Sequence, residues 1–273
     1  MTSSTRVRIG IGGWTFAPWR DNFYPKGLPQ TKELTYASRQ LRTIEINGTF
    51  YRTQSAKTFA NWAEQTPDDF VFSVKAHRLT THRKALGEAR DSVEMFLGSG
   101  ILALAEKLGP IVWQFAPTKK FDAEEFAAFL ECLPKRREGR DLRHVVEVRH
   151  ESFCSEAFIE LLRQHEVAVC YADSPKFPAI ADLCADFVYA RLLRAQASYK
   201  AGYAPRDLDH WAERIKSWEE GRGPGDLPLV GPRQPPRKSG RDCFIYMING
   251  AKEKAPAAAM ALGERLGIQP SLD

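Results

Sequence analysis

Polar and charged side chains recur where short apolar runs of the chain end, and their types suit acid–base chemistry and anion binding. Glu45 and Glu147 each close an apolar run, as do Lys75 and Arg191. A carboxylate transfers protons or orients a cation, whereas lysine and arginine hold phosphate and carboxylate groups, arginine through two parallel hydrogen bonds. Residues that follow apolar runs in the same way are Asn47, His77, Gln114, Arg149, Asp173 and Asn249.

The spacing of these residues places them on a common surface. Glu45 and Asn47 stand two residues apart and therefore share one face of a strand. The carboxyl ends of parallel strands meet at one face, where barrel and open-sheet enzymes build their sites. Charges there are largely removed from water and must pair. We therefore expect three acids to interlock with three cations: Glu45, Glu147 and Asp173 with Lys75, Arg149 and Arg191.

Two sets of roles are predicted for these side chains. Candidate catalytic residues are Glu45, Glu147, Lys75 and Asp173. Candidate ligand-binding residues are Trp14, Asn47, Tyr51, His77, Gln114, Arg149, Arg191 and Asn249. Trp14 and Tyr51 belong to the second set because an aromatic ring with a polar tip can stack on a planar ligand. The structural alternative is an ionic layer that only fills a barrel interior, and it applies more to single residues than to the whole set.

No cofactor or metal is predicted. The sequence contains neither a G-x-x-x-x-G-K-[ST] phosphate loop nor an H-E-x-x-H zinc motif. Glu45, His77, Glu147 and Asp173 do offer oxygen and nitrogen ligands, so a divalent metal is the alternative. The neighbouring lysine and arginines would compete for the same carboxylates, which favours a site without metal.

Eight β-branched or aromatic runs alternate with helix-length segments. The predicted strands are Val7–Ile11, Thr43–Ile46, Phe70–Lys75, Ile111–Phe115, His144–Val148, Val167–Tyr171, Phe187–Leu192 and Cys243–Ile248. The predicted helices are Lys32–Leu41, Thr58–Gln65, Ser92–Leu108, Ala123–Leu133, Glu156–Gln164, Ile180–Cys184, Leu208–Trp218 and Pro256–Leu266. This alternation predicts parallel β-α-β units, and the count of eight favours a closed (β/α)8 TIM barrel over an open doubly wound sheet.

Composition agrees with a single α/β domain over residues 1–273. Of the 273 residues, 43% are hydrophobic and 27% are charged, the balance of an ordinary globular domain. No apolar run approaches the roughly 18 residues of a membrane span. The five cysteines are widely spaced and lack a C-x-x-C pair, which indicates a reducing, cytoplasmic setting.

One segment of the chain, at about 219–242, is expected to be irregular. It contains five prolines and five glycines, which oppose both helix and central strand. Its cations, which raise the alternative of nucleic-acid binding, are Arg222, Arg233, Arg237, Lys238 and Arg241. The segment follows a helix and precedes a strand, so in a barrel it lies on the face opposite the site. A solvated surface insertion is therefore the favoured interpretation.

Several motifs resemble those of a known family. Gly12–Leu28 (GGWTFAPWRDNFYPKGL), Ile44–Arg52 (IEINGTFYR) and Phe70–His82 (FVFSVKAHRLTTH) are similar to motifs of the YecE-like family, domain of unknown function 72. Further matches are Gln114 in WQFAP, Glu147 and Arg149 in VEVRHESF, and Tyr189 and Arg191 in FVYARLL. The resemblance implies a TIM barrel with these residues at its strand ends, and it implies no particular reaction.

Two stretches depart from the family's pattern. The seventh strand of the family usually continues as R-L-H-G, whereas Leu193 and Arg194 occupy the last two positions here. The eighth usually ends in a phenylalanine and two asparagines, and here it ends in Met247, Ile248 and Asn249. These departures suggest the alternative of an inactive barrel scaffold, whose mouth Arg194 and Met247 would block.

Taken together, the residues predict an enzyme or ligand-binding protein that acts on a small phosphate- or carboxylate-bearing molecule. Lys75, Arg149 and Arg191 would hold the anionic group. Glu45 or Glu147 would serve as the general acid or base, with a pKa set by burial beside those cations. Hydrolysis, isomerisation and lyase chemistry remain open, as do the substrate and the oligomeric state.

Overall fold

The computed structural model describes residues 6–271, and in this range eight parallel strands close into a barrel. The strands are β1 (Val7–Gly12), β2 (Thr43–Ile46), β3 (Val71–Lys75), β4 (Leu108–Gln114), β7 (His144–Glu147), β8 (Ala168–Asp173), β9 (Phe187–Leu192) and β10 (Asp242–Met247). β1 pairs with both β2 and β10, which closes the ring. A two-stranded hairpin, β5 (Arg136–Arg137) and β6 (Arg140–Asp141), lies outside it. The predicted TIM barrel is confirmed.

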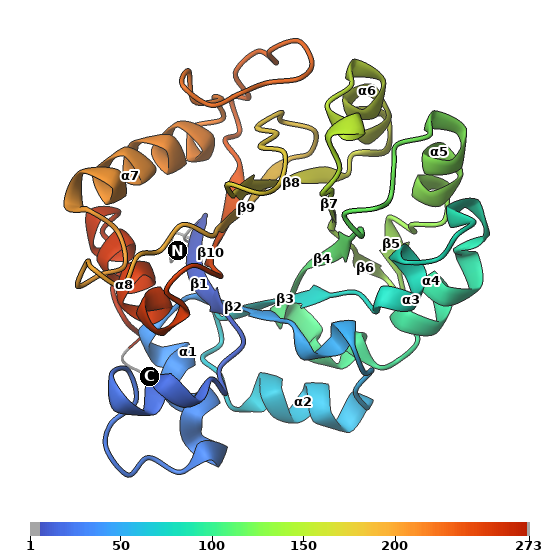
Figure 1. The fold of residues 1–273 in the computed structure, drawn as a ribbon. Coiled ribbons are helices and arrows are strands. Elements are labelled where there is room, and N and C mark those ends of the chain that lie inside the picture. Colours follow the sequence, from blue (N-terminus) through green and yellow to red (C-terminus); the bar gives the residue numbers. More distant parts are fainter. Residues whose placement is uncertain (1–5, 272–273) are drawn as a thin grey trace.

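Helices form an outer ring around the strands (Figure 1). They are α1 (Glu33–Gln40), α2 (Ala56–Glu64), α3 (Arg78–Thr81), α4 (Arg90–Leu97), α5 (Ala123–Glu131), α6 (Glu156–His165), α7 (Pro205–Glu219) and α8 (Ala255–Arg265). Over residues 6–271, no helix is both long and apolar enough to cross a bilayer.

Strand alternation divides the apolar residues into two cores. Side chains such as Ile44 and Met247 face the helices and belong to the outer core. Side chains such as Val112, Cys170 and Tyr246 fill the barrel interior. Tyr246 is tied there through its hydroxyl to Ser73, 2.5 Å away. The interior is therefore packed, and functional side chains have room only above this layer, at the strand ends.

The helix predicted over Ser92–Leu108 is interrupted. α4 ends at Leu97, and a 3-10 helix continues over Ile101–Lys107. Gly100 between them has φ +110°, and a Cβ there would lie 2.5 Å from the backbone nitrogen of Ala56. The close approach of α2 and the left-handed backbone both require glycine, so the helix cannot run through this position.

The helix predicted over Ile180–Cys184 does not form. Residues 174–186 contain no helix, because their polar groups bind the proline-rich segment instead. The Asp182 carboxylate accepts the backbone N–H groups of Val230 and Gly231 at 2.7 and 2.9 Å. The N–H of Ala181 donates to the carbonyl of Pro228 at 3.0 Å. A helix over Ile180–Cys184 would lose these hydrogen bonds to residues 228–231.

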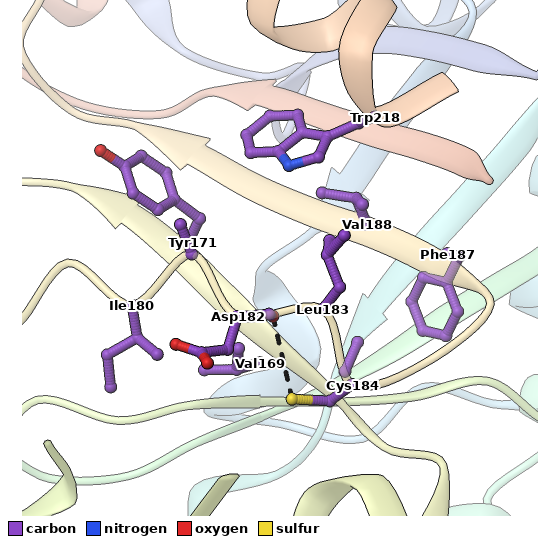
Figure 2. Close-up of a pocket in the computed structure, with 11 residues that line it drawn as sticks. Val169, Tyr171, Ile180, Asp182, Leu183, Cys184, Phe187, Val188 and Trp218 are labelled. Atoms are coloured by element: carbon purple, nitrogen blue, oxygen red, sulfur yellow. Dashed lines mark hydrogen bonds between the residues drawn. The ribbon is translucent and has the colours of Figure 1, made fainter. Parts of the chain in front are cut away.

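Residues 220–241 contain no helix or strand, and part of this segment packs on the barrel rather than extending into solvent. Figure 1 shows it between α6 and α7 in the outer ring. Leu227 and Arg241 are buried. Figure 2 shows Tyr171, Cys184 and Trp218 among the residues that line a small space beside Ile180–Cys184, and its volume of about 10 Å³ is close to the least that can hold one water molecule. The interpretation as a solvated insertion is therefore wrong for this part of the segment.

Candidate functional site

Four charged side chains meet at the carboxyl ends of the barrel strands. Glu45 lies on β2, Lys75 on β3, Glu147 on β7 and Arg191 on β9. Each alternates with outer-core residues, so its side chain faces the barrel interior. Their exposed fractions are 0, 7, 1 and 4%. The charges are thus removed from water, and their stability depends on one another.

Arg191 bridges the two acids. Its Nη1 donates to Glu147 Oε2 at 2.5 Å, and its Nη2 donates to Glu45 Oε1 at 3.0 Å. The Arg191 pKa is raised: burial lowers it, but the carboxylates of Glu147 and Glu45 outweigh that effect. Arg191 therefore carries its charge permanently.

The remaining oxygen of each acid is also bonded. The Tyr189 hydroxyl donates to Glu45 Oε2 at 2.5 Å, and Arg149 donates to Glu147 Oε1 through Nε and Nη2 at 2.8 and 2.7 Å. Burial alone would raise the Glu147 pKa, but Arg191, Arg149 and Lys75 reverse the direction and lower it. Glu147 is therefore held ionised, and both of its carboxylate oxygens accept hydrogen bonds from arginine. This arrangement suits a residue that orients its neighbours.

Lys75 has a different environment from the two arginines. Its Nζ donates to Gln114 Oε1, a neutral amide, and lies 4.2 Å from the centre of the Phe50 ring. Burial, and then the charge of Arg191, lower the Lys75 pKa to about 8, against the opposing carboxylates of Glu147 and Glu45. Lys75 is therefore the cluster member poised to gain or lose a proton near neutral pH.

The cluster holds more positive than negative charge, and one of its hydrogen-bond donors has no partner among the described residues. Three cations (Lys75, Arg149 and Arg191) face two carboxylates, which leaves one positive charge in excess. Arg191 Nε is buried and has no hydrogen-bond partner within the described part of the chain. Gln114 Oε1 receives both Lys75 and Arg149, the latter at 2.7 Å. A buried unpaired donor beside excess positive charge suits an anion.

Asp173 does not join this cluster, contrary to the expected interlocking of all six charges. Cys170 on the same strand faces the interior, so Asp173, three residues later, faces outward. It pairs with Arg194 Nε at 2.7 Å. Burial raises the Asp173 pKa, with Arg194 opposing. The acid–cation network thus contains five of the six predicted members.

Arg194 and Met247 do not point into the barrel mouth as the scaffold hypothesis requires. Met247 faces the helices in the outer core, because it alternates with the inward Tyr246. The Arg194 side chain is 52% exposed and directed to Asp173. Ile248, rather than Met247, holds the inward position.

The other predicted ligand-binding residues have mixed placements. Asn47 Nδ2 donates to the backbone oxygen of Glu45 at 3.3 Å, at the edge of the cluster. His77 caps α3 by accepting the N–H of Leu79 at 3.2 Å. Tyr51 and Asn249 are exposed, Tyr51 by 68%. Trp14 lies in a groove beside the cluster.

That groove has a volume of about 530 Å³ and is lined by the loops after β1 and β2 together with α2. Trp14 and Asn47 are the predicted residues that line it. Trp62 and Lys252 line it as well and were not predicted, since Trp62 lies on the face of α2 and Lys252 begins a 3-10 helix, so that neither directly follows a strand. Tyr189 belongs to the family motif that contains Arg191 but was not among the candidate site residues, although its position two residues before Arg191 places it on the same strand face.

A metal is poorly matched by this arrangement. Over residues 6–271, no three His, Cys, Asp or Glu side chains gather as a metal site needs. The oxygens of Glu45 and Glu147 already accept hydrogen bonds from arginine and tyrosine, so a cation would have to displace them.

Two curated proteins are similar to this chain in sequence. The chain is 28% identical over 159 residues to UPF0759 protein YunF of Bacillus subtilis, covering 56% of this chain and 54% of that protein. It is 31% identical over 150 residues to UPF0759 protein YecE of Escherichia coli K12, covering 54% and 50%. The matched stretch thus spans about half the length of these curated relatives.

Solved structures agree in fold. A DUF72 family protein of Thermotoga maritima superposes with a TM-score of 0.72 at 21% identity, covering 96% of this chain and 99% of that chain. A DUF72 family protein of Enterococcus faecalis gives 0.67 at 14% identity, covering 96% and 97%. The family model described as "Protein of unknown function DUF72" matches residues 8–272. The expected family is thereby confirmed: this chain is a member of the DUF72 family.

Proposed function

We propose that this protein binds a small molecule through a phosphate or carboxylate group at the barrel mouth and transforms it by acid–base chemistry. The observation that carries the proposal is the buried cluster with one positive charge in excess and an Arg191 Nε that has no hydrogen-bond partner among residues 6–271. An anion seated there would accept charge-assisted hydrogen bonds and offset the excess charge.

Lys75 is the proposed proton-transfer group. Its pKa of about 8 lets it exist in both protonation states near neutral pH. Glu147 stays ionised and Arg191 stays charged in this range, so neither can exchange a proton there. Glu45 and Glu147 then act as positioning residues that fix Arg191. Hydrolase, isomerase and lyase reactions are all compatible with this assignment.

The irregular segment gives no support to nucleic-acid binding. Arg222 pairs with Glu220, Arg233 donates to the carbonyl of Gly223 at 3.0 Å, and the buried Arg241 donates to that of Gly221 at 2.5 Å. These cations hold the segment together. The free cysteines among residues 6–271 support a reducing compartment such as the cytoplasm as the place of action.

Calorimetric titration with inorganic phosphate and with acetate tests the anion site. Lys75→Gln should lower the affinity for whichever of the two anions binds more tightly by at least about tenfold, because a charge-assisted hydrogen bond is lost. The matched control is Lys135→Gln, at a lysine that is 63% exposed and pairs with Glu166. Equal affinities in wild type and Lys75→Gln, or no binding of either anion to wild type, would remove the proposal.

A further inference from the structure

The groove beside the cluster is large enough for the body of a small molecule. Its volume of about 530 Å³ falls within the range of ligand sites. It opens above the carboxyl ends of β1 and β2, and Asn47 lines it while bonding to the backbone of Glu45 at 3.3 Å. The groove and the ionic cluster are therefore adjacent.

Aromatic side chains form the walls of this groove. Trp14 and Trp62 meet edge to face, with ring centroids 5.0 Å apart and planes at 82°. The ring centroid of Trp62 lies 5.4 Å from that of the buried Phe59, and the ring centroid of Trp14 lies 6.3 Å from that of Phe72. Each indole thus packs against a buried phenylalanine ring. Rings fixed in this way give a preformed surface for another planar ring.

Gly12 joins the groove to the cluster. A Cβ at this position would lie 2.9 Å from Asn47 Nδ2, 3.0 Å from Ile248 Cδ1 and 4.0 Å from Glu45 Oε1. Because glycine has no side chain, Asn47 and Ile248 pack closely against the backbone here, beside the Glu45 carboxylate. A methyl group at this position would push against Asn47 and Ile248 and so disturb the boundary between groove and cluster.

The charge of the groove favours an anionic ligand over a cationic one. Lys252 lines it, with Nζ 4.6 Å from the centre of the Phe16 ring. Together with the excess charge of the cluster, this ammonium makes the surroundings positive.

We infer that the groove binds a planar aromatic ring belonging to the molecule whose phosphate or carboxylate group sits on Lys75 and Arg191. The ligand class is therefore an aryl phosphate or aryl carboxylate. The inference rests on the proposed anion site and adds to it a second subsite made by Trp14 and Trp62.

The test compares 1-naphthyl phosphate with inorganic phosphate, and 1-naphthoate with acetate, by calorimetric titration of the full chain. The quantity of interest is the ratio of the two affinities within each pair. Wild type should bind one naphthyl compound at least about tenfold more tightly than its simple anion, because the ring is buried against aromatic walls. The pair with the larger ratio identifies the anionic group.

Two variants localise the effect. Trp62→Leu removes an indole wall while keeping an apolar side chain against Phe59, and Gly12→Ala adds a methyl group between groove and cluster. Both should bring the ratio close to one. Tyr199→Leu, at a ring that is 37% exposed and not among the groove's lining residues, should leave the ratio at the wild-type value.

The outcomes separate this inference from the proposed anion site. A wild-type ratio near one with clear phosphate or acetate binding overturns the aromatic subsite alone. A high ratio that neither groove variant changes overturns its location. Binding of 2-naphthol as tight as that of 1-naphthyl phosphate overturns the link between ring and anion. No binding of any anion, simple or aromatic, overturns the anion site itself.

Discussion

Arg191 Nη1 lies 2.5 Å from Glu147 Oε2 in a setting where the exposed fractions of the two side chains are 4 and 1%. Breaking one side of such a pair leaves a charge without its partner in a medium that solvates it poorly. The pair therefore fixes the geometry of the mouth, and its removal has consequences for stability as well as for binding.

Glu147→Gln should lower the free energy of unfolding by about 3 kcal/mol, the cost of leaving Arg191 and Arg149 under-compensated. Urea denaturation at pH 7 measures it. The matched control is Asp173→Asn, an acid-to-amide change in the outward pair with the half-exposed Arg194, which should cost no more than about 1 kcal/mol. Equal losses in the two variants would contradict the structural role given to the Arg191–Glu147 pair.

Anion affinity should depend on pH through Lys75. Its pKa of about 8 means that the ammonium is mostly present below that pH and is lost as the pH rises through it. Binding of sulfate, whose own charge is constant in this range, should be steady from pH 6 to 7 and then fall by up to about tenfold per pH unit above pH 8. Lys75→Gln should give weak binding and a flat profile. A flat profile in wild type would show that Lys75 does not hold the anion.

Lys75→Met should stabilise the unliganded protein at neutral pH. The Lys75 pKa is lowered on folding, so the unfolded chain binds the proton more tightly and the folded state is penalised below pH 8. The penalty fades as the pH rises from 8 towards the ordinary lysine value. Removing the charge should raise the free energy of unfolding by about 1–2 kcal/mol at pH 7, and the gain should shrink by pH 10.

The same comparison separates a binding site from an ionic layer that only fills space. A gain in stability together with a loss of anion binding is the trade-off that functional sites show. If Lys75→Met destabilised the protein by the several kcal/mol typical of a broken buried pair, the lysine would be a structural member of the network.

Asp182→Ala should loosen the irregular segment. The Asp182 carboxylate accepts two backbone N–H groups, from Val230 and Gly231, and losing it leaves both donors unpaired. The expected cost is about 1–3 kcal/mol in free energy of unfolding, with faster proteolysis within residues 220–241. Asp186→Ala, at an exposed acid in the neighbouring turn, is the control. Unchanged proteolysis in Asp182→Ala would mean that other contacts hold the segment.

Strand-end residues could be predicted from the sequence because their signal is local. Glu45, Lys75, Gln114, Glu147 and Arg191 all follow alternation along short apolar runs, and that alternation decides which face they occupy. Asp173, which follows an apolar run, and Met247, which departs from the family's pattern, were placed at the mouth without this alternation: each stands one residue away from an inward position. A shift of one residue moves a side chain to the other face.

Other features depend on contacts between distant parts of the chain. The groove combines Trp14, Trp62 and Lys252 from three separate segments, and no local pattern links them. Ile180–Cys184 has a helical composition, but bonds to residues near Gly231 decide its conformation. Gly100 interrupts a helical pattern because α2 approaches it closely. Tertiary contacts override local preference at each of these places.

Residues 174–186, between β8 and β9, pack against residues near Pro228 and Gly231, and this contact affects the order in which the chain folds. Strands such as β4 and β7 are followed by a helix, α5 and α6, that can shield them soon after both are made. Here the shield for β8 includes residues near Pro228 and Gly231, which come after β9 and α7 in the chain. This side of the molecule therefore completes late during synthesis, and chains that stop before residue 231 present a bare apolar flank to chaperones and to one another.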